Sequence, residues 1–152
     1  LPNLAPPLPL DRGELDWEKR IDSVLRDRDL SDSAKARRLL EMLPALPADA
    51  WESATEKAVT RLRDRDYNSI ALPLLINPGT NGMTQSILFA DLMERPDEIT
   101  LPALLAISRQ NGHPYAPHAL ENLDLLLGEN FGSDWSRWDQ AICRQLANPS
   151  AV

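Results

Sequence analysis

The sequence predicts an all-α fold, and three observations carry that prediction. Apolar residues recur at helical spacing along most of the 152 residues, and no run alternates strictly as a half-buried strand would. Valine and isoleucine, which favour strands, are scarce. The breaks between periodic segments are short and contain Pro, Gly or Asn, so neighbouring helices are expected to be antiparallel. We therefore expect about eight short helices arranged as antiparallel hairpins.

The first three helices are expected before residue 63. Asp16 is a candidate cap for the first, and Ser31 or Ser33 for the second. Asp49 and Glu52 have the spacing of a capping box at the start of the third. The apolar positions expected to face inward on these helices are Trp17, Ile21, Val24, Leu25, Ala36, Leu39, Leu40, Leu43, Trp51, Ala54, Ala58, Val59 and Leu62.

The fourth and fifth helices are expected on either side of an Asn-Pro-Gly turn at residues 77–79. Asp66 or Ser69 would open the fourth helix, and the fifth is expected over residues 82–94. The apolar residues of the fourth helix are Ile70, Leu72, Leu74, Leu75 and Ile76. Those expected to face inward on the fifth are Met83, Ile87, Leu88, Ala90 and Leu92 or Met93.

The last three helices have clear start and stop signals. Asp97 is expected to cap the sixth helix, which would run to about residue 109, and Pro114 suits the first position of the seventh. Gly128 is expected to end the seventh in a left-handed conformation, and Ser133 or Asp134 to cap the eighth. The inward positions expected here are Ala116, Ala119, Leu120, Leu123, Leu127, Trp135, Trp138, Ile142 and Leu146.

A short phrase occurs twice in the second half of the chain. Residues 72–76 read Leu-Pro-Leu-Leu-Ile, and residues 101–105, 29 positions later, read Leu-Pro-Ala-Leu-Leu. Each phrase is followed by a turn and a second apolar stretch, and residues 87–93 align with 120–126 at a shift of 33. A repeat of two helices with a period near this length is typical of stacked helical-repeat proteins.

Segment 99–128 resembles a HEAT repeat. Pro102 lies near the start of the first helix, and the His113-Pro114 turn is placed like the Asp-Pro turn of that family. The second-helix apolar positions of the family are matched by Ala119, Leu120 and Leu123. Thr84 and Pro117 stand where the family typically carries an arginine, and the likeness covers about residues 70–128. The resemblance implies a right-handed α-solenoid, and a compact orthogonal bundle of two similar hairpins is the alternative.

Charge and composition limit the function classes. The net charge is −7, and residues 67–152 carry 9 acidic but 4 basic side chains, which argues against nucleic-acid binding. No apolar run approaches the roughly 20 residues of a transmembrane helix, so membrane contact by the domain itself is not expected. Residues 1–10 are expected to form a Pro-rich disordered linker or boundary segment, followed by a single helical domain over 11–152. An exported or tethered protein that has lost its N-terminal segment is one interpretation of that start, but the compartment stays open.

The residues that could carry chemistry do not form a known catalytic or metal motif. His113 and His118 are five apart, and with Glu121 they fall short of a closed ligand set. Cys143, the single cysteine, is expected to be a half-buried structural residue. The Arg-Asp-Arg-Asp runs at 26–29 and 63–66 are expected to lie at helix ends, with recognition as a minor alternative. We therefore expect no catalytic, cofactor-binding or metal-binding residues.

The sequence thus favours a non-catalytic domain that mediates protein–protein interaction. An extended repeat surface would suit a protein or peptide partner, which no residue pattern identifies. The alternative is a structural or oligomerising domain of a larger protein, whether or not that protein is anchored to a membrane. A monomer or a weak oligomer is expected.

Overall fold

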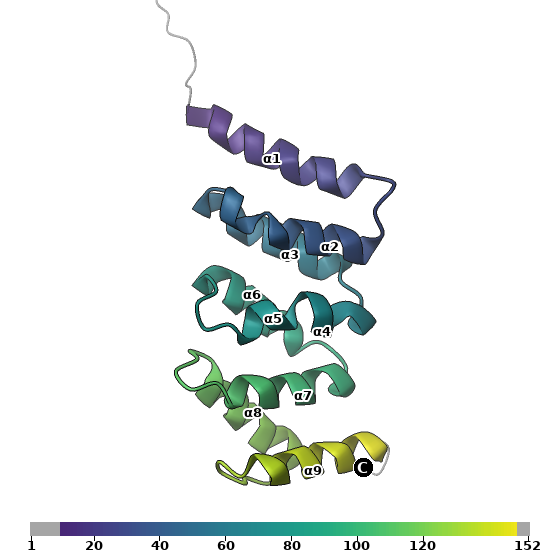
Figure 1. Cartoon of the computed structure of the whole chain (residues 1–152), viewed down its shortest axis with the longest axis vertical. Coiled ribbons are helices and arrows are strands. Elements are labelled where there is room, and N and C mark those ends of the chain that lie inside the picture. Colours follow the sequence, from purple (N-terminus) through teal and green to yellow (C-terminus); the bar gives the residue numbers. More distant parts are fainter. Residues whose placement is uncertain (1–9, 149–152) are drawn as a thin grey trace, which may run out of the picture. The chain divides into compact units, whose positions relative to one another are not determined.

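The computed structural model of the chain describes residues 10–148, and it confirms the all-α prediction. Every regular element in this range is an α-helix or a short 3-10 turn, and no strand occurs there (Figure 1). The chain divides into two compact units, unit 1 (Leu1–Leu62) and unit 2 (Arg63–Val152). Nine of the ten residues of the expected linker lie outside the described residues, and the single domain over 11–152 stays a prediction.

Unit 1 contains three helices, α1 (Leu10–Arg26), α2 (Asp32–Glu41) and α3 (Trp51–Arg61), with 3-10 turns at Leu43–Ala45 and Ala48–Ala50. The α2–α3 pair is the most extensive packing in this unit. Its buried apolar side chains include Ile21, Val24, Ala36, Leu39, Leu40, Leu43, Leu46, Ala50, Ala54, Ala58 and Leu62. Most of the inward positions predicted from helical spacing are therefore buried.

The predicted starts of these helices were right for α2 and wrong for the other two. Ser31 caps α2, because its side chain accepts a hydrogen bond from the Ala34 amide at 3.1 Å. Helix α1 begins at Leu10, six residues before Asp16, because the intervening residues include good helix formers and no proline. The Asp49 capping box does not form, since Asp49 lies inside a 3-10 turn and Ala50 precedes α3 without a side-chain cap.

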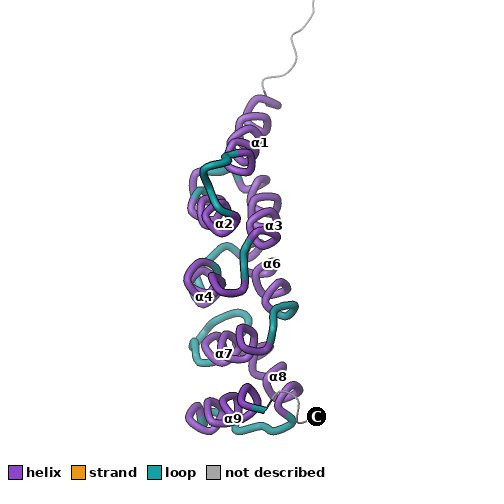
Figure 2. Tube along the Cα trace, turned by 90° about the vertical axis from the view of Figure 1, so that its right-hand side faces the viewer, coloured by secondary structure: helices purple, strands orange, loops and turns teal. Residues whose placement is uncertain are grey.

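Unit 2 contains the helices α4 (Tyr67–Ile70), α5 (Leu72–Ile76), α6 (Gly82–Leu92), α7 (Asp97–Ser108), α8 (Ala116–Leu127) and α9 (Trp135–Ala147), preceded by a 3-10 turn at Asp64–Asp66. Within this unit, α4, α7 and α9 lie in one layer, and α6 and α8 lie in the other (Figure 2). Helix α7 is central, because it packs against α4, α5, α6, α8 and α9. Its Leu101, Leu104 and Ile107 are fully buried.

The two Leu-Pro phrases both fall in helices, with different effects on the backbone. The predicted fourth helix is split at Ala71 into α4 and α5, and Pro73 is the second residue of α5. Pro102 instead lies inside the continuous helix α7. Neither proline can donate to the carbonyl four residues earlier. Both are exposed, so their rings face away from the core.

The exposed side of α6 differs from the prediction. Met83 and Ala90 were expected to face inward but are exposed, whereas Thr84 and Gln85 are buried. Asn81 caps the helix by accepting hydrogen bonds from two amides of its first turn, one of them that of Thr84. The buried Gln85 amide donates to the Asn77 carbonyl at 2.7 Å, which satisfies the polar group. The inward side of α6 could not be predicted from the sequence, because apolar residues occur on several sides of this helix.

Four further helix ends test the sequence signals. Asp97 is the first residue of α7, and Pro96 before it is the N-cap residue. Helix α8 begins at Ala116, later than the predicted Pro114. Gly128 ends α8 with a φ of 77°, as predicted, and its amide donates to the Asp124 carbonyl. Asp134 caps α9 through a bond from the Arg137 amide at 3.2 Å, also as predicted.

The two hairpins of unit 2, α4–α6 and α7–α8, bury corresponding positions. For the first helices the correspondence holds at the expected shift of 29, which pairs Ile70 with Ile99, Pro73 with Pro102 and Leu75 with Leu104. For the second helices it holds at 35 rather than the expected 33, which pairs Thr84 with Ala119 and Leu88 with Leu123, all buried. The shift is larger for the second helices than for the first because α7 and the loop after it are longer than α5 and its loop.

Candidate interaction surface

The histidines have separate environments. His113, in the loop between α7 and α8, is 3% exposed. Its Nε2 donates to the Leu75 carbonyl at 2.6 Å, and its Nδ1 accepts from the Tyr115 amide at 3.0 Å. Both ring nitrogens are therefore occupied, which fixes the neutral tautomer and ties this loop to the end of α5. His118 is exposed on α8.

The histidines and the cysteine were also compared with the requirements of a metal site. Among residues 10–148, no three His, Cys, Asp or Glu side chains are grouped so as to hold a metal ion. Cys143 is exposed, which corrects the prediction that it is half-buried. Helix α9 buries Trp138, Ala141 and Ile142, and the residue after Ile142 lies about 100° further round the helix, on its outer side. In the same part of the chain no helix has the length and apolarity needed to cross a bilayer.

One of the two Arg-Asp runs joins a charged cluster around Arg95. The Arg95 Nη1 contacts the Asp64 Oδ1 at 2.9 Å, and its Nη2 contacts the Asp91 Oδ2 at 3.0 Å. The guanidinium lies 5.2 Å from the ring centroid of Tyr67, and the Arg95 side chain is only 9% exposed. Sequence reasoning missed this cluster, because Asp64 and Arg95 are 31 residues apart.

Burial sets the electrostatics of the Arg95 cluster. It raises the pKa of Asp91 above its usual value, although the charge and hydrogen bond of Arg95 act against this. For Tyr67, burial and then the charge of Asp91 raise the pKa. Burial works to lower the pKa of Arg95, but hydrogen bonding to Asp64 and the charge of Asp91 outweigh it and raise the pKa. Tyr67 is fully buried, and the arginine is paired with two carboxylates. We therefore interpret the cluster as a structural clamp, which holds the segment of Asp64 and Tyr67 to the loop after α6.

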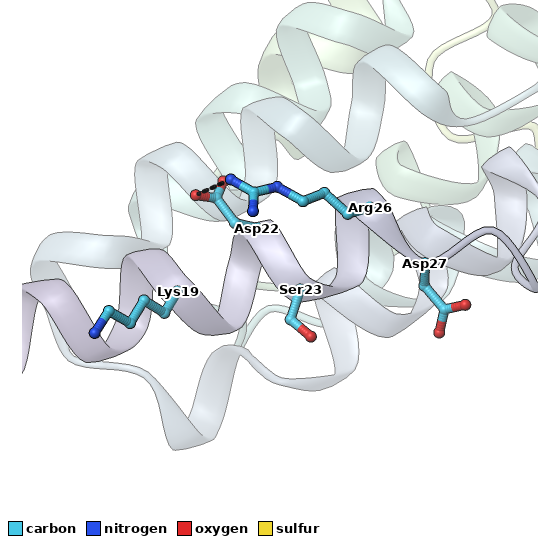
Figure 3. Close-up of a pocket in the computed structure, with 5 residues that line it drawn as sticks. All are labelled: Lys19, Asp22, Ser23, Arg26 and Asp27. Carbon is cyan, nitrogen blue, oxygen red and sulfur yellow. Dashed lines mark ion pairs between the residues drawn. The ribbon is translucent and has the colours of Figure 1, made fainter.

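Two hollows in unit 1 are each lined by side chains of mixed charge and polarity. An open hollow of about 690 Å³ is lined by the α1 residues Lys19, Asp22, Ser23, Arg26 and Asp27. Figure 3 shows that these side chains point in different directions, with only the Arg26–Asp22 pair meeting, at 3.7 Å. Both side chains of that pair are at least half exposed, so the ion pair contributes little to the stability of the fold.

A smaller hollow of about 200 Å³ lies between α1 and α3. Its lining consists of Trp17, Glu18, Ile21, Asp22, Ser53 and Lys57. The Nε1 of Trp17 is buried without a hydrogen-bond acceptor, and Lys57 donates to the Ser53 hydroxyl at 2.8 Å. Donors and two carboxylates face the same space, so its charges do not select one class of ligand.

A clearer candidate is the outer side of the second helices of unit 2. The large apolar side chains most exposed among the described residues are Met83 at 47%, Leu125 at 74% and Leu126 at 46%. All three lie on α6 or α8, which share one layer (Figure 2). We call this surface the second-helix face, formed by the exposed residues Met83, Ser86, Ala90, His118, Glu121, Leu125 and Leu126.

The second-helix face includes corresponding positions of the two hairpins of unit 2. At the shift of 35, Met83 corresponds to His118, and Ala90 corresponds to Leu125, with all four exposed. Sequence reasoning assigned two of these residues to the core and did not single out Leu125. A signal was present, because Leu125 lies off the inward stripe of Ala119, Leu123 and Leu127.

Comparison of the chain with protein-family models, with curated proteins and with solved structures finds no match in any of the three.

Proposed function

We propose that this chain is a non-catalytic helical-repeat domain that binds a protein or peptide partner through the second-helix face. The observation that carries the proposal is the placement of the three most exposed large apolar side chains on α6 and α8. When a partner covers an apolar side chain that folding leaves in water, the burial stabilises the complex. The stabilisation is about 1.5–3 kcal/mol for a fully buried leucine. Surfaces of this kind are what repeat architectures offer to partners.

We further propose that unit 2 is an atypical HEAT-like array with two complete hairpins and α9 beside α7. The matched burial of the two hairpins supports this, as does the packing of α9 against α7. The outer side of α9 is polar, with Ser136, Asp139, Gln140 and Arg144 exposed, which suits a terminal element of a repeat array. The array differs from the family in its polar links, because here Arg95, in the loop between α6 and α7, binds Asp64.

Site-specific photo-crosslinking tests the proposed function. A photoreactive residue replaces Leu125 on the second-helix face or, as a matched control, Pro102 on the exposed side of α7. We expect a specific crosslinked partner from position 125 and none from position 102. Equal labelling from both positions, or none from 125 in the cell of origin, would contradict the proposal.

Self-association is the second candidate, because the exposed Leu125 and Leu126 could also meet a second copy. Analytical ultracentrifugation over a wide concentration range separates the two proposals. A concentration-dependent dimer that Leu125→Ser abolishes would favour the oligomerising domain. A monomer at all concentrations would remove it.

A further inference from the structure

The charged side chains nearest to Leu125 and Leu126 along the chain are acidic, and the nearest basic one is Arg137, whose guanidinium lies 4.8 Å from the centroid of the Phe131 ring. Residues 110–136 contain four carboxylates and no lysine or arginine. Two of the carboxylates have structural roles. Asp124 accepts a hydrogen bond from the side-chain amide of Asn130 at 3.4 Å, and Asp134 caps α9. The other two, Glu121 and Glu129, are exposed and take part in none of the hydrogen bonds or ion pairs found among residues 10–148.

These two glutamates lie on either side of the exposed leucines. Glu121 precedes Leu125 by about one helical turn, a rise of roughly 6 Å, and so lies on the same side of α8. Glu129 follows Gly128, directly after the end of the helix. The C-terminal end of α8 adds the partial negative charge of its terminal carbonyls. An apolar patch is thus bordered by negative charge at both ends.

We infer that this end of the second-helix face binds a basic, amphipathic peptide segment of a partner protein. An apolar side chain of the segment packs on Leu125 and Leu126, and its lysines or arginines pair with Glu121 and Glu129. This inference rests on the proposed function and names the chemistry of its partner. Charge complementarity selects the occupant, since an acidic segment would be repelled and a neutral apolar one would leave the carboxylates without partners.

The same charges argue against two other occupants. A second copy of the chain would bring Glu121 and Glu129 towards the same pair of carboxylates on its partner. The anionic leaflet of a membrane attracts basic rather than acidic surfaces.

A peptide titration tests the inference on the full chain. The probe is a fluorescein-labelled 18-residue peptide of leucine and lysine at helical spacing, and its counterpart carries glutamate in place of lysine. We expect the lysine peptide to bind more weakly as salt rises, and the glutamate peptide not to bind. Equal binding of the two peptides would overturn the inference.

Two variants and a matched control localise the binding. Leu125→Ser with Leu126→Ser should weaken the lysine peptide about tenfold or more, through lost apolar contact. Glu121→Gln with Glu129→Gln should weaken it about three- to tenfold and flatten the salt dependence. Glu52→Gln with Glu56→Gln makes the same charge change on exposed positions of α3 and should change affinity less than about twofold. An equal loss in this control would show general attraction to an acidic protein, and would overturn the assigned site.

Selection from a random peptide library separates this inference from the proposed function. The full chain is the bait, and the double serine variant is used for counter-selection. Enrichment of basic, leucine-rich peptides supports both proposals. Enrichment of neutral or acidic peptides would overturn the inference while the interaction function stands, and no enrichment would count against both.

Discussion

Removal of the Arg95 side chain is expected to destabilise unit 2 by about 2–3 kcal/mol. Breaking a fully buried ion pair costs about 3–5 kcal/mol. A lower value applies here, because the Asp91 side chain is 18% exposed and the Asp64 side chain is 50% exposed. We assign most of the loss to Asp91, less than about 1 kcal/mol to Asp64, and roughly 0.5–1 kcal/mol to the contact with the Tyr67 ring.

The cost of Arg95→Ala should depend on pH, and its sign follows from Asp91. Because burial raises the pKa of Asp91 in the folded state, ionising it works against folding as the pH rises above the ordinary value of about 4. Arg95 opposes that shift, so its removal raises the pKa of Asp91 further. The stability difference between wild type and Arg95→Ala should therefore be smaller near pH 4.5 than at pH 7.

Urea unfolding followed by circular dichroism measures both effects. Double-mutant cycles with Asp91→Asn and Asp64→Asn divide the cost between the two carboxylates, and we expect the larger coupling for Asp91. A loss below about 0.5 kcal/mol at pH 7 would refute the clamp, since surface substitutions cost that little. A coupling to Asp64 larger than that to Asp91 would refute the assignment by burial.

Three further substitutions test single contacts by thermal or urea unfolding. His113→Ala should cost about 2–4 kcal/mol, because it leaves a cavity and two unpaired backbone groups, whereas His118→Ala on the surface should stay within about 0.5 kcal/mol. Thr100→Val should cost about 1–2 kcal/mol, because the buried hydroxyl lies 2.8 Å from two carbonyls at the end of α6, and exposed Thr60→Val serves as control. Gly128→Ala should cost about 1–2 kcal/mol, since its φ of 77° is strained for any residue with a Cβ, and faster amide exchange at the end of α8 should accompany the loss. A neutral result at either His113 or Gly128 would contradict the geometry described for that position.

Helical periodicity and turn residues predicted the fold class and most helix positions, because these signals are local. Ser31, Gly128 and Asp134 act as their sequence context predicts, since each satisfies backbone groups within a few residues. Where a local signal competed with another local structure, prediction failed. Asp49 has capping-box spacing, but the chain before α3 forms a 3-10 turn that excludes it.

Contacts between distant residues could not be predicted from the sequence. The partner of His113 is a backbone carbonyl 38 residues earlier, which has no sequence signature at all. Asp64 and Arg95 are among many acids and bases, so their pairing could not be singled out. The face of α6 was misjudged for another reason, because almost every position in its centre is apolar and periodicity cannot choose among them.

Corresponding positions of the two hairpins of unit 2 show which leucines core packing requires and which it does not. Leu88 and Leu123 correspond at a shift of 35, and both are fully buried, so packing accounts for an apolar residue at each. Leu125 corresponds to Ala90, and both are exposed, so the same packing requires no leucine there. A leucine 74% exposed to water gives the isolated domain no core contact comparable to that of Leu123. Core packing therefore does not require a leucine at position 125, which supports placing the proposed partner site there.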